Sequence, residues 1–313
     1  MTDKLGLGTM GMNFGNKESS LATIRKALEL GITVFNTGDF YQGGESQVVL
    51  GQALKGVPRQ NCFVSLKFGV SFTPQGAFLD VNPANIKGKL LHSLHETGLD
   101  YVDLYQPARQ DTAVPVEDVV GEIAQLVKEG YVKHVGLSEV DAQTLRRAHK
   151  VHPIHSVEVE YSLLNREIEQ ELVATAQELG VMVVVYGAVG HGVLTNKVFD
   201  GGMANPMLSR GILSEANKQH NLAVLSRFNQ MAAELNLSMS ELALAWTQAK
   251  YDNILTLIGT TKPNHLQSSV TAVNTRLSAE TVKDIQEVLS AQTVSGITMR
   301  KWVFTNGVGR LTV

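Results

Sequence analysis

Short runs of β-branched and aliphatic residues alternate with amphipathic stretches eight times along the chain, and this alternation limits the possible folds more than any other feature. The strands that it predicts are Leu5–Thr9, Thr33–Asn36, Cys62–Lys67, Tyr101–Gln106, Val132–Leu137, Ser156–Glu160, Val181–Tyr186 and Ile254–Ile258. The helices that it predicts after them are Ser19–Leu30, Glu45–Leu54, Pro83–Thr97, Val116–Lys128, Asp141–Lys150, Glu167–Leu179, His220–Leu235 and Lys262–Val273. Eight such units close most simply into a (β/α)8 TIM barrel, with an open doubly wound sheet as the alternative.

Nothing in the composition divides the chain or gives it a surface of one charge. The 313 residues carry a net charge of −3 with Lys and Arg scattered, so we expect neither a nucleic-acid nor a membrane partner. No linker interrupts the pattern, which predicts one domain over residues 1–313 with 296–313 as a C-terminal tail. Cys62 is the only cysteine and no run of about 18 apolar residues occurs, so a cytoplasmic location is expected. The oligomeric state is not indicated.

Two sequence motifs match ligand-binding patterns but lack the context that such sites need. Gly6–Gly11 matches the G-x-G-x-x-G dinucleotide fingerprint, but polar residues follow it, and Asp39 comes later than the acidic residue expected about 20 positions on. A turn at a strand end is therefore expected there. His149, His152 and His155 are predicted to end a helix, occupy a loop and begin a strand, so their imidazoles should not converge on a metal.

Polar residues at the carboxyl ends of the predicted strands are the candidates for chemistry, because barrel enzymes place their active sites there. Asp39, Tyr41 and Lys67 follow or end the second and third strands. A lysine that ends an apolar strand needs a partner, since an unpaired buried charge is costly. We expect Asp39 to be that partner.

These residues belong to a longer ordered set, which is Asp39-Phe40-Tyr41, Gly44-Glu45, Lys67, Asp103-Leu104-Tyr105, Gly136-Leu137-Ser138 and Glu160-Tyr161-Ser162-Leu163. In order and spacing the set closely resembles the aldo-keto reductase family, and the resemblance runs from Leu5 to about Leu289. It implies an NADPH-dependent reductase of small carbonyl compounds, with Tyr41 as the proton donor and with Asp39 and Lys67 beside it.

The chemistry of carbonyl reduction suits these three side chains. Hydride transfer leaves an alkoxide, so a nearby general acid has to supply a proton. The Tyr41 phenol can supply it, and a cation beside a tyrosine lowers its pKa from about 10 toward the working pH. We expect Lys67 to be that cation and Asp39 to hold the lysine in place.

Three positions depart from the family pattern. Ala108 stands where the family usually has a histidine that donates a hydrogen bond to the substrate carbonyl. A substrate with its own polar group, a donor such as Arg109, or loss of activity would each account for this change. Glu158 and Glu139 stand where Gln and Asn usually hold the nicotinamide carboxamide. Their negative charge is expected to stabilise the oxidised nicotinamide and to favour a cationic substrate.

The stretches Asp103–Asp111, Leu145–His149 and Val157–Tyr161 look most like the branch of the family that includes pyridoxal reductases. Pyridoxal carries a hydroxyl beside its aldehyde, which would replace the missing donor, and a ring nitrogen that can be protonated. Two alternatives remain open. One is an NADPH-binding regulatory or sensor subunit on the same fold, which Ala108 favours, and the other is an alcohol dehydrogenase that works in the oxidative direction.

The resemblance also implies a cofactor site and a substrate pocket. Glycines after the seventh strand would let backbone N–H groups approach the pyrophosphate, and the helix start at 259–262 would suit a 2′-phosphate. The residues expected to bind NADPH are Gly8, Thr9, Met10, Asp39, Ser138, Glu139, Glu158, Tyr186, Gly187, Gly190, Gly192, Leu194, Gly259, Thr260, Thr261, Lys262, Ser268 and Ser269. The residues expected to line the substrate pocket are Asn13, Phe14, Phe40, Phe68, Ala108, Arg109, Arg300 and Trp302.

Overall fold

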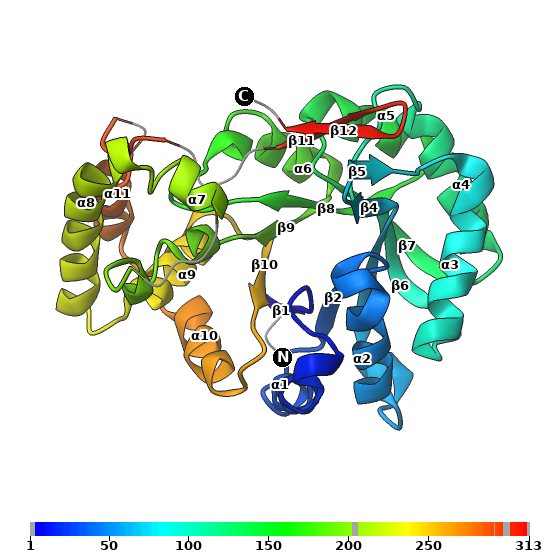
Figure 1. The fold of residues 1–313 in the computed structure, drawn as a ribbon, viewed down its shortest axis with the longest axis horizontal. Coiled ribbons are helices and arrows are strands. Elements are labelled where there is room, and N and C mark those ends of the chain that lie inside the picture. Colours follow the sequence, from blue (N-terminus) through cyan, green and yellow to red (C-terminus); the bar gives the residue numbers. More distant parts are fainter. Residues whose placement is uncertain (1–3, 202–205, 291, 297–300, 312–313) are drawn as a thin grey trace.

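Eight parallel strands close into a barrel in the computed structural model, which describes residues 4–201, 206–290, 292–296 and 301–311 (Figure 1). Around the barrel the strands follow the order β1-β10-β9-β8-β7-β6-β3-β2. Their bounds are β1 (Leu5–Gly8), β2 (Val34–Gly38), β3 (Phe63–Phe68), β6 (Val102–Pro107), β7 (Val132–Ser138), β8 (Ile154–Glu160), β9 (Met182–Tyr186) and β10 (Ile254–Gly259). The predicted (β/α)8 barrel is confirmed, and the open doubly wound sheet is excluded.

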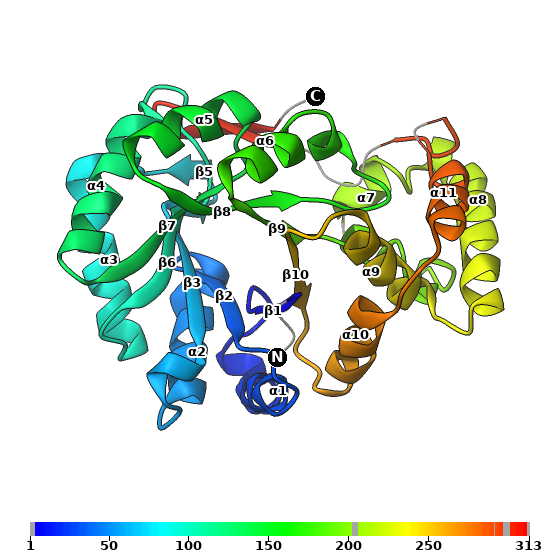
Figure 2. The same cartoon turned by 180° about the vertical axis from the view of Figure 1, so that it is seen from behind.

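Helices form an outer layer around the strands, as the view from behind also shows (Figure 2). Their bounds are α1 (Lys17–Glu29), α2 (Glu45–Leu54), α3 (Pro83–Thr97), α4 (Val116–Lys128), α5 (Ala142–Val151), α6 (Leu172–Leu179), α7 (Pro206–Arg210), α8 (Glu215–Glu234), α9 (Met239–Lys250), α10 (Asn264–Asn274) and α11 (Ala279–Val288). Local signals set their ends. The Asn82 side chain accepts a hydrogen bond from the Ala84 amide at the start of α3, and Gly98 ends that helix with a φ of 68°.

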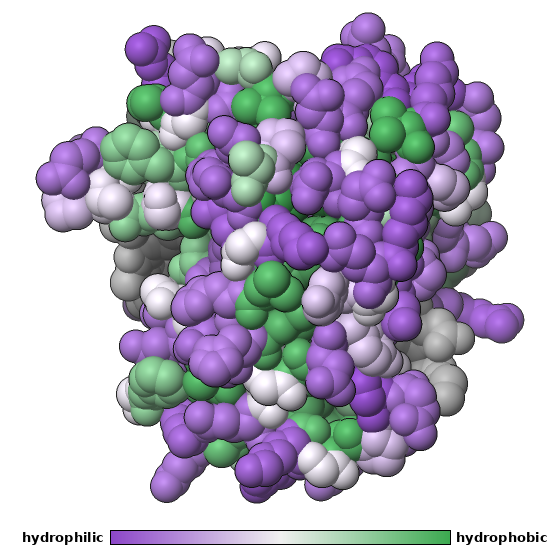
Figure 3. Space-filling model, turned by 90° about the vertical axis from the view of Figure 1, so that its right-hand side faces the viewer, coloured by the Kyte–Doolittle hydropathy of each residue, from purple (hydrophilic) through white to green (hydrophobic). Residues whose placement is uncertain are grey.

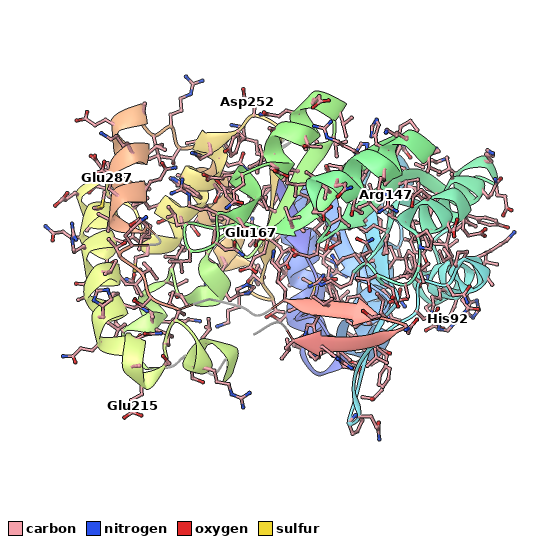
Figure 4. The ribbon with its side chains drawn as sticks, turned by 90° about the horizontal axis from the view of Figure 1, so that it is seen from above. His92, Arg147, Glu167, Glu215, Asp252 and Glu287 are labelled. Atoms are coloured by element: carbon pink, nitrogen blue, oxygen red, sulfur yellow. The ribbon has the colours of Figure 1, made fainter. Side chains whose placement is uncertain are left out.

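The helix that packs beside β10 is α9, which corrects the prediction of a barrel helix at His220–Leu235. That stretch belongs to α8, whose principal contacts are with α9 and α11. In Figure 4, Glu215 of α8 and Glu287 of α11 lie at the same end of the molecule, at its lower and upper edges. The prediction missed α9 because six consecutive residues, 242–247, are buried, so the one-sided apolar stripe of an amphipathic helix is absent.

A second, four-stranded sheet lies outside the barrel, and the C-terminal tail supplies half of it. Its strands are β4 (Val70–Thr73), β5 (Gly76–Leu79), β11 (Trp302–Thr305) and β12 (Val308–Leu311). The first two follow β3 directly, so this sheet lies at the carboxyl end of the barrel, where the sequence places the chemistry. The sequence predicted a tail there but no strands.

A buried aspartate fixes the C-terminal hairpin to the barrel. The Asp111 carboxylate, which follows β6, accepts hydrogen bonds from the amides of Asn306 and Gly307 at 3.0 and 2.5 Å. Trp302 at the start of the hairpin is half-buried in this second sheet. Arg300, which was expected in the pocket wall, lies outside the described residues.

Polar side chains cover most of the molecular face on the side of α3 and α4, with small groups of hydrophobic side chains between them (Figure 3). Arg147 of α5 contributes to this kind of surface through an ion pair with Glu117 of α4, with 2.7 Å between the charged groups. In the part of the chain that the structure describes, no helix is both long and apolar enough to cross a bilayer.

Candidate active site

A buried ion pair crosses the barrel near the carboxyl ends of its strands. The Lys67 ammonium on β3 lies 2.7 Å from one carboxylate oxygen of Glu158 on β8, and the two side chains are 3% and 4% exposed. Asn36 on β2 and Gln106 on β6 each donate a side-chain hydrogen bond of 2.7 Å to the other oxygen. Asn36 also accepts a hydrogen bond from Lys67. The network therefore ties four strands together and holds the lysine in one orientation.

Asp39 takes no part in this network, which corrects the expected pairing with Lys67. Its carboxylate accepts a hydrogen bond from the Gly69 amide at 3.4 Å, and it forms no ion pair with any described residue. Burial raises the pKa of Asp39 to about 6, although the Gly69 amide and the charge of Lys89 counteract it. Several carboxylates end strands in this sequence, and order along the chain does not indicate which one reaches across the barrel.

Tyr41 lies in a tight turn at residues 41–44, directly beside the ion pair. Lys67 Nζ is 5.2 Å from the centroid of the Tyr41 ring, and Phe40 packs edge-on against the same ring with 4.8 Å between centroids. Burial raises the pKa of the Tyr41 phenol, the charge of Lys67 lowers it, and the charge of Glu158 raises it again. The expected net lowering of this pKa is therefore wrong, because burial dominates and Glu158 offsets the cation.

The Arg109 guanidinium lies next to Ala108 at the end of β6. Ala108 is fully buried, and Arg109 folds back so that its Nη1 donates to the Ala108 carbonyl at 2.6 Å. Burial tends to lower the pKa of Arg109, but the influence of Tyr186, Glu139 and Tyr41 outweighs it and the pKa is raised. The charge of Arg109 is thus felt by groups on both sides of the site.

The neighbouring strands β7, β8 and β9 bring together four residues that were expected to bind the cofactor. Ser138 pairs with Glu158 in the strand register. The Tyr186 hydroxyl and the Glu160 amide both donate to one oxygen of Glu139, at 2.9 and 2.7 Å. Glu139 has a left-handed backbone with a φ of 52°, which a residue with a side chain adopts only where its surroundings hold it. These contacts keep the Tyr186 ring in a fixed position at the rim.

The loop after β9 follows a path that requires glycine. Gly187, Gly190 and Gly192 have φ angles of 71°, 57° and 97°. A β-carbon on Gly190 would lie 2.8 Å from Leu164 Cδ1. Leu194 is fully buried and anchors the far side of the loop. The backbone amides of such a loop can approach a phosphate closely.

The ends of β1 and β10 also meet at the rim. Gly8 and Gly259 are partners in the strand register. Thr9 is fully buried and its hydroxyl donates to Thr37 at 2.9 Å, whereas Met10 is 63% exposed. At the end of β1, therefore, a bound molecule can reach the backbone but not the Thr9 side chain.

Three basic side chains gather at the start of α10. The Lys262 amide donates to Thr260 Oγ1 at 3.1 Å, which orders the turn before the helix. The pKa of His265 is lowered, first by partial burial and then by the charges of Lys262 and Lys197. Lys197 was not among the expected cofactor residues, and its place in the unusually long loop after β9 was the only signal for it in the sequence.

The other residues expected near the adenosine use their polar groups locally. Ser268 and Ser269 both donate their hydroxyls to the His265 carbonyl, at 3.1 and 2.9 Å. The Thr261 carbonyl accepts a hydrogen bond from Ser19 of α1. These contacts stabilise the start of α10 and leave its amides and Lys262 as the groups that can hold an anion.

The residues expected in the substrate pocket fall into two groups. Phe40 packs against Tyr41 at the centre of the site. Phe68 is fully buried. In this conformation it can support the pocket floor but cannot contact a ligand. Asn13 caps a short turn at 14–16, and Phe14 is 51% exposed beside it.

The glycine-rich motif at residues 6–11 and the three histidines between 149 and 155 have other roles. Residues 6–11 run from the barrel strand β1 into a turn, which is the expected alternative to a Rossmann site. His149 accepts a hydrogen bond from the Ile154 amide, while His152 lies by the Pro153 carbonyl. Among the described residues, no three potential metal ligands converge.

Comparison with known proteins assigns the chain to one family. A model of the Aldo/keto reductase family matches residues 4–290. The chain belongs to the aldo/keto reductase family. A probable aldo-keto reductase from Glycine max is 34% identical over 307 residues, which cover 94% of this chain and 87% of that protein. The expectation of an oxidoreductase of this family is confirmed.

Solved structures agree with the barrel. An aldo-keto reductase from Bacillus halodurans in its holo form has a TM-score of 0.78 and 28% identity, with 92% of each chain covered. The glycerol dehydrogenase from Gluconobacter oxydans has a TM-score of 0.82 at 23% identity, covering 92% of this chain and 91% of its own. An aldo-keto reductase from Klebsiella pneumoniae in complex with NADPH has a TM-score of 0.73 at 23% identity, covering 91% and 90%. At 23% identity the likeness shows the fold alone.

The Gly190 turn offers a test of the loop. Gly190→Ala is expected to lower the free energy of unfolding by about 1–2 kcal/mol, because the left-handed backbone strains a residue with a β-carbon even if Leu164 moves aside. Gly88→Ala is the matched control, since Gly88 is exposed in α3 with open space around it, and it should raise stability by up to about 1 kcal/mol. Denaturant unfolding measures both, and equal effects would contradict the described loop.

Proposed function

We propose that this protein reduces a small aldehyde or ketone to the alcohol with NADPH, using Tyr41 as the proton donor. Membership of the aldo/keto reductase family supports the reaction class. The observation that carries the proposal is the meeting of Tyr41 with the Lys67–Glu158 pair at the mouth of the barrel. A phenol, a cation and its counter-charge are the groups that proton delivery to a developing alkoxide needs.

The residues at the rim fit NADPH. The Ser138 hydroxyl is buried without a hydrogen-bond partner among the described residues, as expected for a group that a bound ligand completes. Lys197, Lys262 and His265 at the start of α10 suit the extra phosphate that distinguishes NADPH from NADH. The NADPH complex of the Klebsiella pneumoniae protein gives the same cofactor on the same fold. When bound, NADPH supplies the hydride that reduces the carbonyl carbon.

Tyr41 delivers the proton in this mechanism. Its raised pKa keeps the phenol protonated at neutral pH, so the group is ready to act as an acid. As the carbonyl oxygen gains negative charge, the proton passes from Tyr41 Oη to that oxygen and becomes the product hydroxyl proton. The phenolate that remains faces the Lys67 ammonium, and water restores the proton after the alcohol leaves.

Arg109 takes over the role of the missing histidine. Its guanidinium has five N–H donors, and one of them is used by the Ala108 carbonyl. Nη1 is therefore engaged, while other donors remain for a substrate oxygen. A cationic donor near Tyr41 stabilises the developing alkoxide, which is the task of the histidine at the position of Ala108 in other members.

Pyridoxal is the substrate that we propose to test first. Its ring hydroxyl, which lies beside the aldehyde, can donate a hydrogen bond to the carbonyl oxygen from within the substrate itself. Its ring nitrogen can be protonated, and Glu139 places a carboxylate at the rim that a cation would favour. The support for this choice is the chemistry of the two departures from the family, at Ala108 and Glu139, together with the sequence resemblance.

A second candidate function is an NADPH-binding regulatory subunit. The observation in its favour is Ala108, which removes a donor that the family usually has. The two functions differ in one outcome, because the regulatory subunit would bind NADPH without reducing any aldehyde.

The proton-donor role predicts a large effect of removing one hydroxyl. Tyr41→Phe is expected to lower kcat for pyridoxal and for simple aldehydes by roughly 10²- to 10⁴-fold, because the general acid is lost. NADPH oxidation measured by absorbance reports the rate. Tyr251→Phe is the control, since Tyr251 precedes β10 at the opposite end of the barrel, and its kcat should stay at the wild-type level.

Arg109→Met, measured in the same assay, separates the substrate idea from the mechanism. Simple aldehydes should lose more activity than pyridoxal, whose own hydroxyl compensates in part for the missing donor.

Full activity of Tyr41→Phe would overturn the proton-donor role. NADPH binding without turnover of any aldehyde by the wild type would favour the regulatory subunit.

The basic cluster at α10 predicts a selective loss of NADPH affinity. Lys262→Ala and Lys197→Ala are each expected to weaken NADPH binding by roughly tenfold, because a charged contact to the 2′-phosphate is lost, and to leave NADH binding unchanged. Titration calorimetry measures both cofactors. Lys283→Ala on the exposed face of α11 is the control. An equal loss of affinity for NADPH and NADH would show that the cluster does not recognise the 2′-phosphate.

A further inference from the structure

The partner of Lys67 is unusual in where it comes from. Glu158 reaches the ammonium from β8, which is three strands away from β3 around the barrel. Both of its oxygens are engaged, one by Lys67 and the other by Asn36 and Gln106. A carboxylate held by three side chains at hydrogen-bond distance cannot turn away from the lysine without breaking all of these contacts.

The carboxylate nearer in sequence to Tyr41 is occupied elsewhere. Asp39 bonds the Gly69 amide at 3.4 Å, in the turn that leads from β3 to β4. Its charged neighbour is Lys89 of α3, on the outer side of the barrel. Asp39 therefore contacts the backbone that shapes the second sheet and does not contact the ammonium of Lys67.

We propose that Glu158 is the positioning residue that sets the placement of Lys67 and, through it, the proton affinity of Tyr41, and that Asp39 does not have this role. The proposal rests on the proposed function of the same site, since it assigns a control of the proton donor. It also revises the expected role of Glu158 toward the nicotinamide, because the charge of this glutamate is already engaged by Lys67.

The charges that face Tyr41 come from three elements. Lys67 approaches from β3, Glu158 from β8, and Arg109 from the turn after β6, while the Phe40 ring on the remaining side carries no charge. Removing the negative charge of Glu158 leaves two cations facing the phenol. The phenolate is then favoured, so Tyr41 should ionise at a lower pH. Removing the charge of Asp39 alters none of these three groups.

The matched variants are Glu158→Gln and Asp39→Asn, because each replaces a carboxylate by an amide of nearly the same shape. The apoprotein is titrated with alkali while the ultraviolet absorbance of ionised tyrosine is followed. The same titration with Tyr41→Phe in each background isolates the signal of Tyr41. Circular dichroism marks the pH range in which each variant keeps its fold, and only that range is compared.

Tyr41 is expected to ionise about one pH unit lower in Glu158→Gln than in the wild type, and at the wild-type pH in Asp39→Asn. A shift in Asp39→Asn, with or without one in Glu158→Gln, would overturn the proposal. An unshifted titration in both variants would overturn it as well. If Glu158→Gln does not fold, Glu158→Asp replaces it, because the shorter side chain withdraws the carboxylate from Lys67 and should lower the pH at which Tyr41 ionises. An unshifted titration in Glu158→Asp would then overturn the proposal.

The pH profile of turnover separates this proposal from the proposed function. The alkaline limb of kcat/KM should move to lower pH in Glu158→Gln and stay in place in Asp39→Asn. A shifted tyrosine titration in a protein that reduces no aldehyde would contradict the reductase function and leave the role of Glu158 intact. If Glu158→Gln reduces aldehydes but shifts neither the Tyr41 titration nor the alkaline limb of kcat/KM, the role of Glu158 is contradicted and the reductase function stands.

Discussion

The buried ion pair between Lys67 and Glu158 is the interaction on which the active site depends. Removing two charges from water costs several kcal/mol for each ion, and their attraction offsets this only when the remaining polar atoms are also bonded. Asn36 and Gln106 provide those bonds. Because well-packed apolar residues often stabilise a fold as well as a buried ion pair does, stability alone does not account for these charges, and the proposed proton transfer at Tyr41 gives them a function.

The closed barrel makes this arrangement possible. Parallel strands bring all their carboxyl ends to one rim, so residues that are distant in sequence meet without a long loop. One part of the rim holds Tyr41, the proposed proton donor. Another part, where Gly8 lies beside Gly259, leads to the basic start of α10. Arg109, which follows Ala108 after β6, adds a cation to this rim, and its Nη1 donates to the Ala108 carbonyl.

Sequence periodicity was sufficient for the barrel, since most strand residues are buried and most helices have one apolar face. It was insufficient for α9, which is buried on most sides, and for the hairpin β11–β12, which pairs with strands more than two hundred residues earlier. Motif order singled out Tyr41 and Lys67, which the fold brings close together. It did not identify Glu158 as the partner, because contacts across a barrel depend on which side chains point inward and on their reach. Lys197 was missed because it lies in the long loop after β9, whose path toward the start of α10 the sequence does not indicate.

The central claim is that this site moves a hydride and a proton to a carbonyl, and isotope transfer tests it most directly. NADPH labelled with deuterium at the transferred position of its nicotinamide C4 is incubated with the protein and pyridoxal, and the alcohol is analysed by mass spectrometry. The account predicts one deuterium on the carbon that carries the new hydroxyl. An alcohol without deuterium, or labelled NADPH that binds without forming product from pyridoxal or any simple aldehyde, would contradict it.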